Sequence, residues 1–269
     1  MRRAIAILLL VATPAAFAAD VRKIRALNIS AQSAATLISA LIQHKIHRPA
    51  DALKCLGYGA ASGYGFYEAK LLARRGDVQS GWIVANVAGS ISENTAAGRG
   101  PVDQLGYSIG PARIRFSFVN ADSYAYVDFN AYEAASLVTA YRDNDRMRYR
   151  SGMIAFERDS FYPNQNGVNG RIVGITYGIF PGVYTHTVTS TRNHEVIHAM
   201  QALQADSVDP SFRFLSYEPA RATERRIIRF EFVKLGAFNL ASDVVTGRQQ
   251  YRNRWNEIEA YRLAQNRAP

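Results

Sequence analysis

The chain has 269 residues, with 32 lysines and arginines against 22 aspartates and glutamates, a net charge of +10 at pH 7 when histidine is neutral. Its one cysteine, Cys55, excludes an intramolecular disulfide framework and a zinc site built from cysteines, and predicts a small buried apolar residue. A chain of this length can bury one large core or two small ones.

The first residues have the pattern of a secretory signal peptide. Met1-Arg2-Arg3 precedes an apolar run over residues 4–11, and Ala16-Phe17-Ala18 follows as a small-residue cleavage site. The run is too short to cross a bilayer, and no later stretch has 18 uninterrupted apolar residues, so no transmembrane segment is expected after cleavage. We therefore expect residues 1–18 to be removed near Ala18 and the mature protein to be periplasmic or secreted.

The mature chain would keep 30 basic and 22 acidic residues, a net charge of +8. In a bacterial envelope this charge favours anionic surfaces such as lipid headgroups or acidic polymers, and nucleic acid is not expected as a partner there. The basic residues are densest over residues 221–229. A solvated basic face and an anionic envelope partner both remain open.

Residues 19–105 are expected to form a helical region. Helical spacing of apolar residues predicts a first helix over residues 30–46, a second over residues 49–75 and a third over residues 81–97. The second contains the glycine-rich run 57–65, which lacks the G-x-G-x-x-G order. We interpret this run as a place of close backbone packing, not as a phosphate loop.

His44 and His47 lie between the first two predicted helices. They are three residues apart and could share a metal ion. No acidic or cysteine partner lies near them in the sequence, so we interpret both as surface residues.

Residues 106–269 are expected to form an α+β region, or one compact domain together with residues 19–105. Two-residue alternation predicts strands at the positions listed at the end of this paragraph, and Asn130 to Glu133 reads as a capping box that opens a helix to about Tyr141. The expected fold class is α+β, with N-terminal helices, a central mixed or antiparallel sheet, and C-terminal helices. These last helices should carry a metal site, whose residues are given in the next paragraphs. The predicted strands are 114–118, 124–128, 151–156, 171–180 and 183–189.

Residues 194–198 read His-Glu-Val-Ile-His, an HExxH motif that should lie on a helix ending near Ala205. On a helix, His194 and His198 are one turn apart on the same face, where both imidazoles can reach a single metal ion. Glu195 lies beside that face and can accept a proton from a water bound to the metal. The motif therefore predicts a metal site with a general base.

This segment resembles the active-site helix of the zincin metallopeptidases over about ten residues. The resemblance implies a catalytic Zn²⁺ bound by His194 and His198, with Glu195 as the general base. It predicts an exported zinc-dependent hydrolase, a metalloendopeptidase of the gluzincin type with a protein or peptide substrate. Arg192 stands where that family usually has an uncharged residue.

A catalytic zinc needs a third protein ligand, and three carboxylates are candidates. Glu257 begins a segment that resembles the E-x-x-A-D-x-x-A helix of one gluzincin group, in which the first glutamate binds zinc; here Tyr261 replaces the aspartate. Glu218 resembles in spacing the glutamate of aminopeptidase-like gluzincins. Our hypothesis is that Glu257 is the ligand, with Glu218 and Glu259 as alternatives. Two helices are expected here, over residues 219–235 and 252–265.

The chemistry also requires a donor for the negative charge that develops on the substrate carbonyl oxygen. Tyr184, His186, Tyr217 and Tyr251 are four candidates for this role. Two other functions are alternatives. One is a non-catalytic envelope protein with a closed four-ligand metal site, completed by His186. The other is a cationic binding module for anionic envelope polymers, which would bind no stoichiometric zinc.

Overall fold

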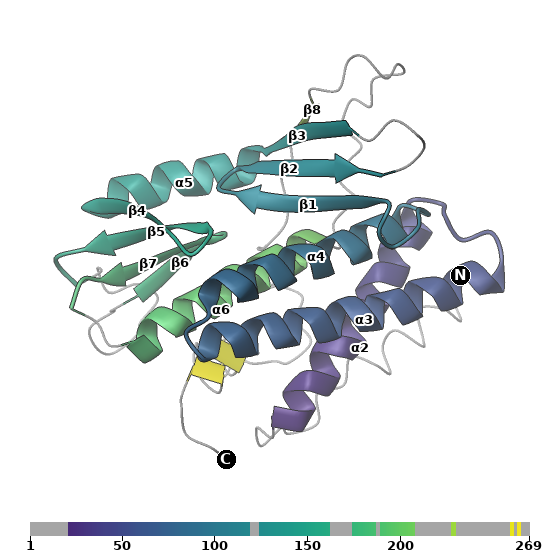
Figure 1. Cartoon of the computed structure of the whole chain (residues 1–269), viewed down its shortest axis with the longest axis horizontal. Helices are drawn as coiled ribbons and strands as arrows, with labels where there is room; N and C mark the ends of the chain where they lie inside the picture. The colour runs from purple at the N-terminus through teal and green to yellow at the C-terminus, as the bar shows by residue number, and fades with distance from the viewer. Residues whose placement is uncertain are drawn as a thin grey trace.

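The computed structural model describes the N-terminal helices, strands β1 to β8, helix α5, the HExxH helix and short C-terminal pieces (Figure 1). The described residues are 21–118, 124–161, 174–186, 189–207, 227–229, 259–260 and 263–264. The helices are α2 (Val21–Ile42), α3 (Pro49–Arg74), α4 (Val78–Ala96), α5 (Ala131–Asp143) and α6 (Thr189–Ser207). The strands are β1 (Gln104–Ile109), β2 (Ala112–Ser117), β3 (Tyr124–Asn130), β4 (Arg146–Arg150), β5 (Met153–Arg158), β6 (Gly174–Tyr177), β7 (Phe180–Tyr184) and β8 (Ile227–Arg229). Residues 259–260 and 263–264 are also helical.

The expected α+β class is confirmed, with three N-terminal helices before the first strand and helical residues near the C-terminus. The single central sheet is wrong, because the described strands form two four-stranded sheets. Their strand orders are β1-β2-β3-β8 and β4-β5-β7-β6, and each mixes parallel with antiparallel pairs. Helix α5 follows β3 in the chain and separates the two runs of strands (Figure 1).

Helices α2 and α3 approach each other so closely that glycine is required at the contact. A Cβ atom at Gly59 would lie 2.7 Å from the Cα atom of Ser33, and one at Gly63 would overlap the carbonyl oxygen of Asn28. Cβ atoms in close-packed interiors do not approach backbone atoms this closely. The interpretation of the glycine run as close backbone packing is confirmed.

The start of α2 was predicted nine residues too late, at Ser30 instead of Val21. Asn28, in the part of the helix that was missed, is buried and continues the four-residue spacing of the buried Gln32 and Thr36. These positions are helical in period but polar in character. Apolar periodicity therefore does not detect the first turns of the helix.

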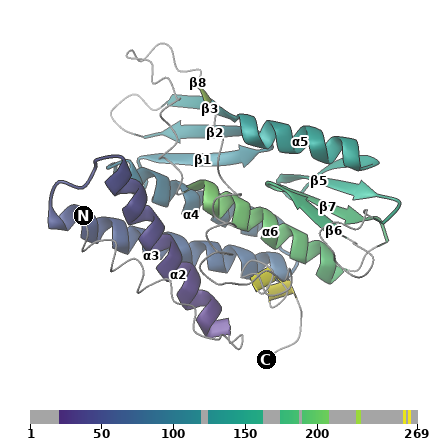
Figure 2. The same ribbon diagram turned by 180° about the vertical axis from the view of Figure 1, so that it is seen from behind.

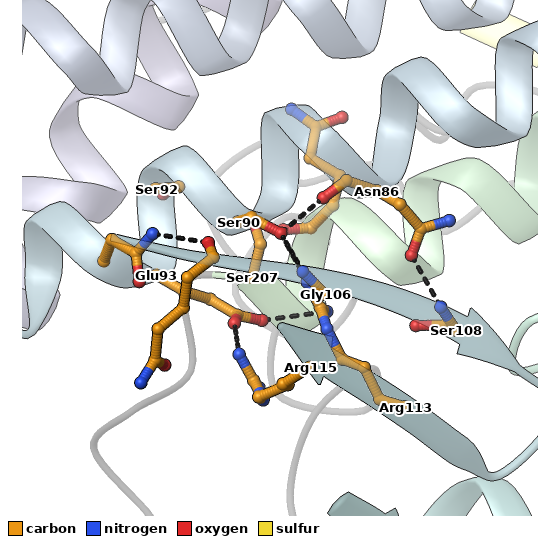
Figure 3. A network of polar contacts seen from close by, with 12 residues as sticks. Asn86, Ser90, Ser92, Glu93, Gly106, Ser108, Arg113, Arg115 and Ser207 are labelled. Atoms are coloured by element: carbon orange, nitrogen blue, oxygen red, sulfur yellow. Dashed lines mark hydrogen bonds and ion pairs between the residues drawn. The ribbon is translucent and has the colours of Figure 1, made fainter. Parts of the chain in front are cut away.

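Helix α4 uses polar side chains to cover the free edge of β1, as Figure 3 shows. The backbone N–H of Ser108 donates to Asn86 Oδ1 at 2.9 Å, and the backbone N–H of Gly106 donates to Ser90 Oγ at 2.8 Å. Strand β1 is the last strand of its sheet and pairs with β2 on its other side. The bonds to α4 thus satisfy main-chain groups that could otherwise pair with another chain.

Glu93 on the same helix binds two arginines of β2 (Figure 3). Arg113 Nη1 lies 2.9 Å from Glu93 Oε1, and Arg115 Nη1 bonds Glu93 Oε2. All three side chains are buried. The face of the sheet toward α4 is therefore charged, while Phe116 and Phe129 on the opposite face are 45% and 40% exposed.

Helix α6 lies in the middle of the molecule, between the N-terminal helices and the second sheet (Figure 2). It contacts α3, α4, β6 and β7. Met200 joins the main buried cluster together with Phe66 and Phe180. Ile197 joins a second cluster that includes Leu263 from the C-terminal part. The HExxH helix is consequently buried on several sides, which restricts the positions of its side chains.

Two predicted strands have different limits in the structure. The strand predicted over residues 151–156 corresponds to β5, which begins at Met153. Strand β4, which was not predicted, pairs with β5 in a hairpin whose turn contains Ser151 and Gly152, both with positive φ. The chain also turns at Gly178 (φ +58°), within the strand predicted over residues 171–180. Positive φ is favourable for glycine but rare for serine, so the first turn carries a weaker sequence signal.

The helix predicted over residues 219–235 is contradicted by β8, which occupies residues Ile227–Arg229. This short strand pairs in parallel with β3, with Ile227 opposite Asp128. Two consecutive isoleucines favour a strand, and the pairing partner lies about 100 residues earlier in the chain. Pro219 at a first-turn position suggested the helix, but the pairing with β3 determines the conformation of residues 227–229.

Other local predictions are confirmed in full or in part. The Asn130 side chain accepts the backbone N–H of Glu133 at 3.2 Å, so the first half of the predicted capping box is present. The second half differs, because the backbone N–H of Asn130 donates to the carbonyl oxygen of Pro111 and Glu133 Oε2 accepts from the backbone N–H of Ile179. His44 and His47 are exposed, and Cys55 is buried. No helix within the described ranges is long and apolar enough to cross a bilayer.

The close approach of α2 and α3 generates a prediction about stability. Gly63→Ala should lower the free energy of unfolding by about 1–3 kcal/mol, because the new methyl group meets backbone atoms of α2 that cannot move alone. Gly57→Ala is the matched control, since Gly57 is in the same helix and nothing lies within 4 Å of its Cβ position. That variant should gain about 0.5–1 kcal/mol. Chemical denaturation measures both, and equal effects would contradict the packing argument.

Candidate metal site

Helix α6 brings the two motif histidines together. His194 Nε2 and His198 Nε2 are 3.0 Å apart, and the ring centroids are 4.6 Å apart with an interplanar angle of 86°. His194 is 8% exposed, and His198 is partly buried. The two imidazoles thus present the same nitrogen to one point at the helix surface.

This arrangement fits a zinc ion. Two histidine nitrogens bound to tetrahedral zinc at about 2.0–2.1 Å lie about 3.3–3.4 Å apart, so the pair has to open by only a few tenths of an ångström. The third ligand is not identified: no group of three or more histidine, cysteine, aspartate or glutamate residues that could bind a metal occurs among the residues the structure describes. The predicted ligand Glu257 and the alternative Glu218 lie outside those residues.

Glu195 lies against the outer strand of the second sheet. Its carboxylate is buried, and Oε2 accepts a hydrogen bond from the Thr176 hydroxyl of β6 at 2.7 Å. A Cβ atom at Gly174, also in β6, would lie 2.6 Å from Glu195 Oε1. The absence of a side chain at Gly174 therefore creates the space that the carboxylate occupies.

The Nδ1 side of His198 is in contact with a buried polar network. His198 Nδ1 lies 2.7 Å from Gln201 Oε1, and Gln201 Nε2 donates to Glu259 Oε2 at 2.7 Å. Lys70 forms a buried ion pair with Glu259, at 2.9 and 3.0 Å to its two oxygens. Burial lowers the pKa of Lys70, and the neighbouring Glu259 carboxylate opposes that shift.

Glu259 was an alternative third ligand, and the structure places it in this network. Its Oε1 accepts from Asn28 Nδ2 at 2.6 Å and from Lys70, while its Oε2 accepts from Lys70 and Gln201. It lies on the Nδ1 side of His198, whereas the Nε2 atoms of the histidine pair face each other. In this arrangement both Glu259 oxygens bind protein groups.

The network contains residues that the sequence analysis did not identify. No sequence pattern marks Lys70 and Asn28 as parts of this network, because their partner Glu259 is more than 180 residues away in the chain. Gln201 could have been found, since it lies three residues after His198 and thus on the same helix face.

Of the four candidate donors to the substrate carbonyl oxygen, Tyr184 and His186 lie within the described residues. Tyr184 ends β7 and packs against Phe161, with ring centroids 4.6 Å apart, and against His186, with centroids 5.5 Å apart. His186 is exposed. The other two candidates, Tyr217 and Tyr251, lie outside the described residues.

Two nearby polar side chains are engaged in structural contacts. Tyr177, the last residue of β6, donates to Asp143 at 3.0 Å, and burial together with this hydrogen bond raises its pKa. Arg192 Nη2 donates to the carbonyl oxygen of Thr185 at 3.0 Å. The arginine that distinguishes this segment from the zincin pattern therefore connects the start of α6 to the end of β7.

The comparisons with known proteins identify no relative of this chain. No family model, no curated protein and no solved structure matches it. A function for the chain has to be inferred from the geometry of its own residues.

Proposed function

We propose that this protein is an exported zinc-dependent hydrolase, a metalloendopeptidase of the gluzincin type, that acts in the periplasm or after secretion. The observation that carries the proposal is the convergence of His194 and His198, whose Nε2 atoms are 3.0 Å apart on a buried helix. The second support is Glu195, which follows the first histidine and has its own buried contacts. Glu257 is proposed as the third ligand.

Each motif residue has a distinct role in this proposal. A bound Zn²⁺ would lower the pKa of a coordinated water to about 7 and would polarise a carbonyl group. His194 and His198 would hold the ion through Nε2, and the Glu195 carboxylate would accept a proton from the water that the ion activates. The Thr176 hydroxyl, 2.7 Å from Glu195 Oε2, orients that carboxylate.

The position of β6 supports a peptide substrate. Among the described strands of its sheet, β6 is the last in the order β4-β5-β7-β6, and it contains Gly174 and Thr176, which lie against the Glu195 carboxylate. An extended peptide can add to the edge of a sheet through main-chain hydrogen bonds. A peptide aligned along β6 would pass beside the general base.

The metal itself provides the most direct test. The mature protein, purified without chelators, should contain about one zinc ion per chain by elemental analysis. His198→Ala should lower both the zinc content and the melting temperature, because a ligand is lost and metal binding stabilises the fold. His47→Ala, at an exposed histidine, is the control and should change neither. Absence of zinc from the wild-type protein, or unchanged zinc content in His198→Ala, would exclude the site.

The role of Glu195 can be tested separately from the metal. Glu195→Gln keeps the size of the side chain and an oxygen for Thr176 but removes the base, so hydrolysis of labelled casein should fall by about 10²–10⁴-fold with zinc content unchanged. Glu157→Gln, which affects a surface ion pair, is the control and should keep full activity. Substantial turnover by Glu195→Gln would show that another group accepts the proton.

Gly174→Ala tests whether the position of the carboxylate matters. The added methyl group would lie 2.6 Å from Glu195 Oε1, so the flexible end of the glutamate has to move. We expect lower casein hydrolysis at nearly unchanged melting temperature and zinc content, because the group that moves is a side-chain terminus. Full activity in this variant would contradict the placement of Glu195 against β6.

A further inference from the structure

A continuous path of buried polar contacts connects the ion pair of Lys70 and Glu259 to His198. Lys70 is fully buried, and Glu259 is 2% exposed. Gln201 lies between the ion pair and the histidine, with Nε2 2.7 Å from Glu259 Oε2 and Oε1 2.7 Å from His198 Nδ1. The path joins side chains of α3, α6 and the C-terminal helical residues.

The charges at the far end of this path follow from its hydrogen bonds. Lys70 Nζ has three acceptor groups within bonding distance, at 2.8 Å from Asn28 Oδ1, 2.9 Å from Gln204 Oε1 and 2.9–3.0 Å from the Glu259 oxygens. An ammonium group has three N–H donors and no acceptor, so three acceptor groups match its protonated form. The Glu259 carboxylate is then ionised as its counter-charge and can only accept hydrogen bonds.

The carboxylate determines which way the Gln201 amide points. The –NH₂ group of Gln201 must face Glu259, because the opposite orientation would place the amide oxygen 2.7 Å from a carboxylate oxygen. The amide oxygen therefore faces His198 Nδ1, and an acceptor at that nitrogen requires a proton on it. A neutral histidine protonated at Nδ1 has its lone pair on Nε2, the atom that faces His194.

We propose that Gln201 is a positioning residue. The buried Lys70–Glu259 ion pair orients the Gln201 amide, and in this orientation the amide oxygen keeps His198 in its Nδ1-protonated tautomer. The consequence for zinc binding rests on the proposed function. If zinc binds as proposed, the lone pair of His198 Nε2 already faces the metal position before the ion binds. The C-terminal helical residues then contribute to the site through Glu259 without binding the ion.

The first measurement uses the metal-free wild-type protein and does not depend on zinc or activity. A side-chain ¹H–¹⁵N correlation spectrum distinguishes the two neutral tautomers of histidine. It is recorded at a pH well above the ordinary histidine pKa of about 6.5, so that the ring is neutral. We expect the His198 ring to carry its proton on Nδ1. A ring protonated on Nε2 in the wild-type protein would overturn the proposal, and no variant is needed for that result.

The second measurement compares two variants of the same helix. Gln201→Leu removes the acceptor at His198 Nδ1. Gln204→Leu is the matched control, because the Gln204 side chain accepts from Lys70 and donates to Gln32 and does not bond the histidine. In the metal-free protein the His198 tautomer should shift toward Nε2–H in Gln201→Leu only. Chelator competition should show zinc binding weakened about 10–100-fold in Gln201→Leu and by less than about 3-fold in Gln204→Leu.

The outcomes separate this inference from the proposed function. An unchanged tautomer in a folded Gln201→Leu variant, or equal effects of the two substitutions, would overturn the inference even if the wild-type protein binds zinc and hydrolyses casein. If the wild-type protein binds no zinc, the proposed function fails. A tautomer shift confined to Gln201→Leu would still support the positioning role in that case.

Discussion

The close contact between α2 and α3 is the constraint on which the candidate site depends. Gly63 allows the backbone of α2 at Asn28 to touch α3, and the Asn28 side chain then reaches both Lys70 and Glu259. A larger residue at position 63 would separate the helices at the point where this polar network forms. The glycines of α3 thus influence the surroundings of the histidine pair, because they allow the helix contact at which the polar network forms. None of these glycines lies near the HExxH motif in the sequence.

Two groups of buried ion pairs among the described residues each connect a helix to another element. Glu93 joins α4 to two arginines of β2, and Lys70 joins α3 to Glu259. A buried ion pair adds little net stability, because desolvation offsets much of the attraction, but removing one partner leaves an uncompensated charge and costs about 3–5 kcal/mol. These pairs therefore disfavour alternative packings of the same helices more than they stabilise the native one.

Local signals made much of the helical part predictable, and long-range contacts explain most of the errors. Pro49 at the start of α3 and Gly76 after its end are local signals, and both limits were predicted well. The first turns of α2 were missed because Asn28 is buried for its hydrogen bonds and not for its hydrophobicity. Strand β8 was missed because it forms only by pairing with β3. Alternation in β2 located that strand, but it could not show that the arginine face, with Arg115, points inward.

The same distinction applies to the candidate site. The pairing of His194 with His198 is a property of one helix, so the sequence predicts it directly. The environment of the pair is made by segments far apart in the chain, and a carboxylate in the C-terminal part can serve as a ligand or as a partner of a buried lysine. The positions of Lys70, Asn28 and Gln201 around Glu259 distinguish these roles.

An amide next to a metal-binding histidine differs physically from the carboxylate that often occupies this place. A carboxylate accepts a hydrogen bond from Nδ1–H in either orientation and brings its negative charge close to the metal. Glutamine has one donor end and one acceptor end, so it specifies a tautomer only if another group fixes its direction. In this chain Glu259 fixes the direction of the Gln201 amide. The Gln201 side chain therefore separates the negative charge from His198, and Lys70 neutralises that charge. The orientation of His198 consequently depends on the docking of α2, α3 and the C-terminal helical residues together.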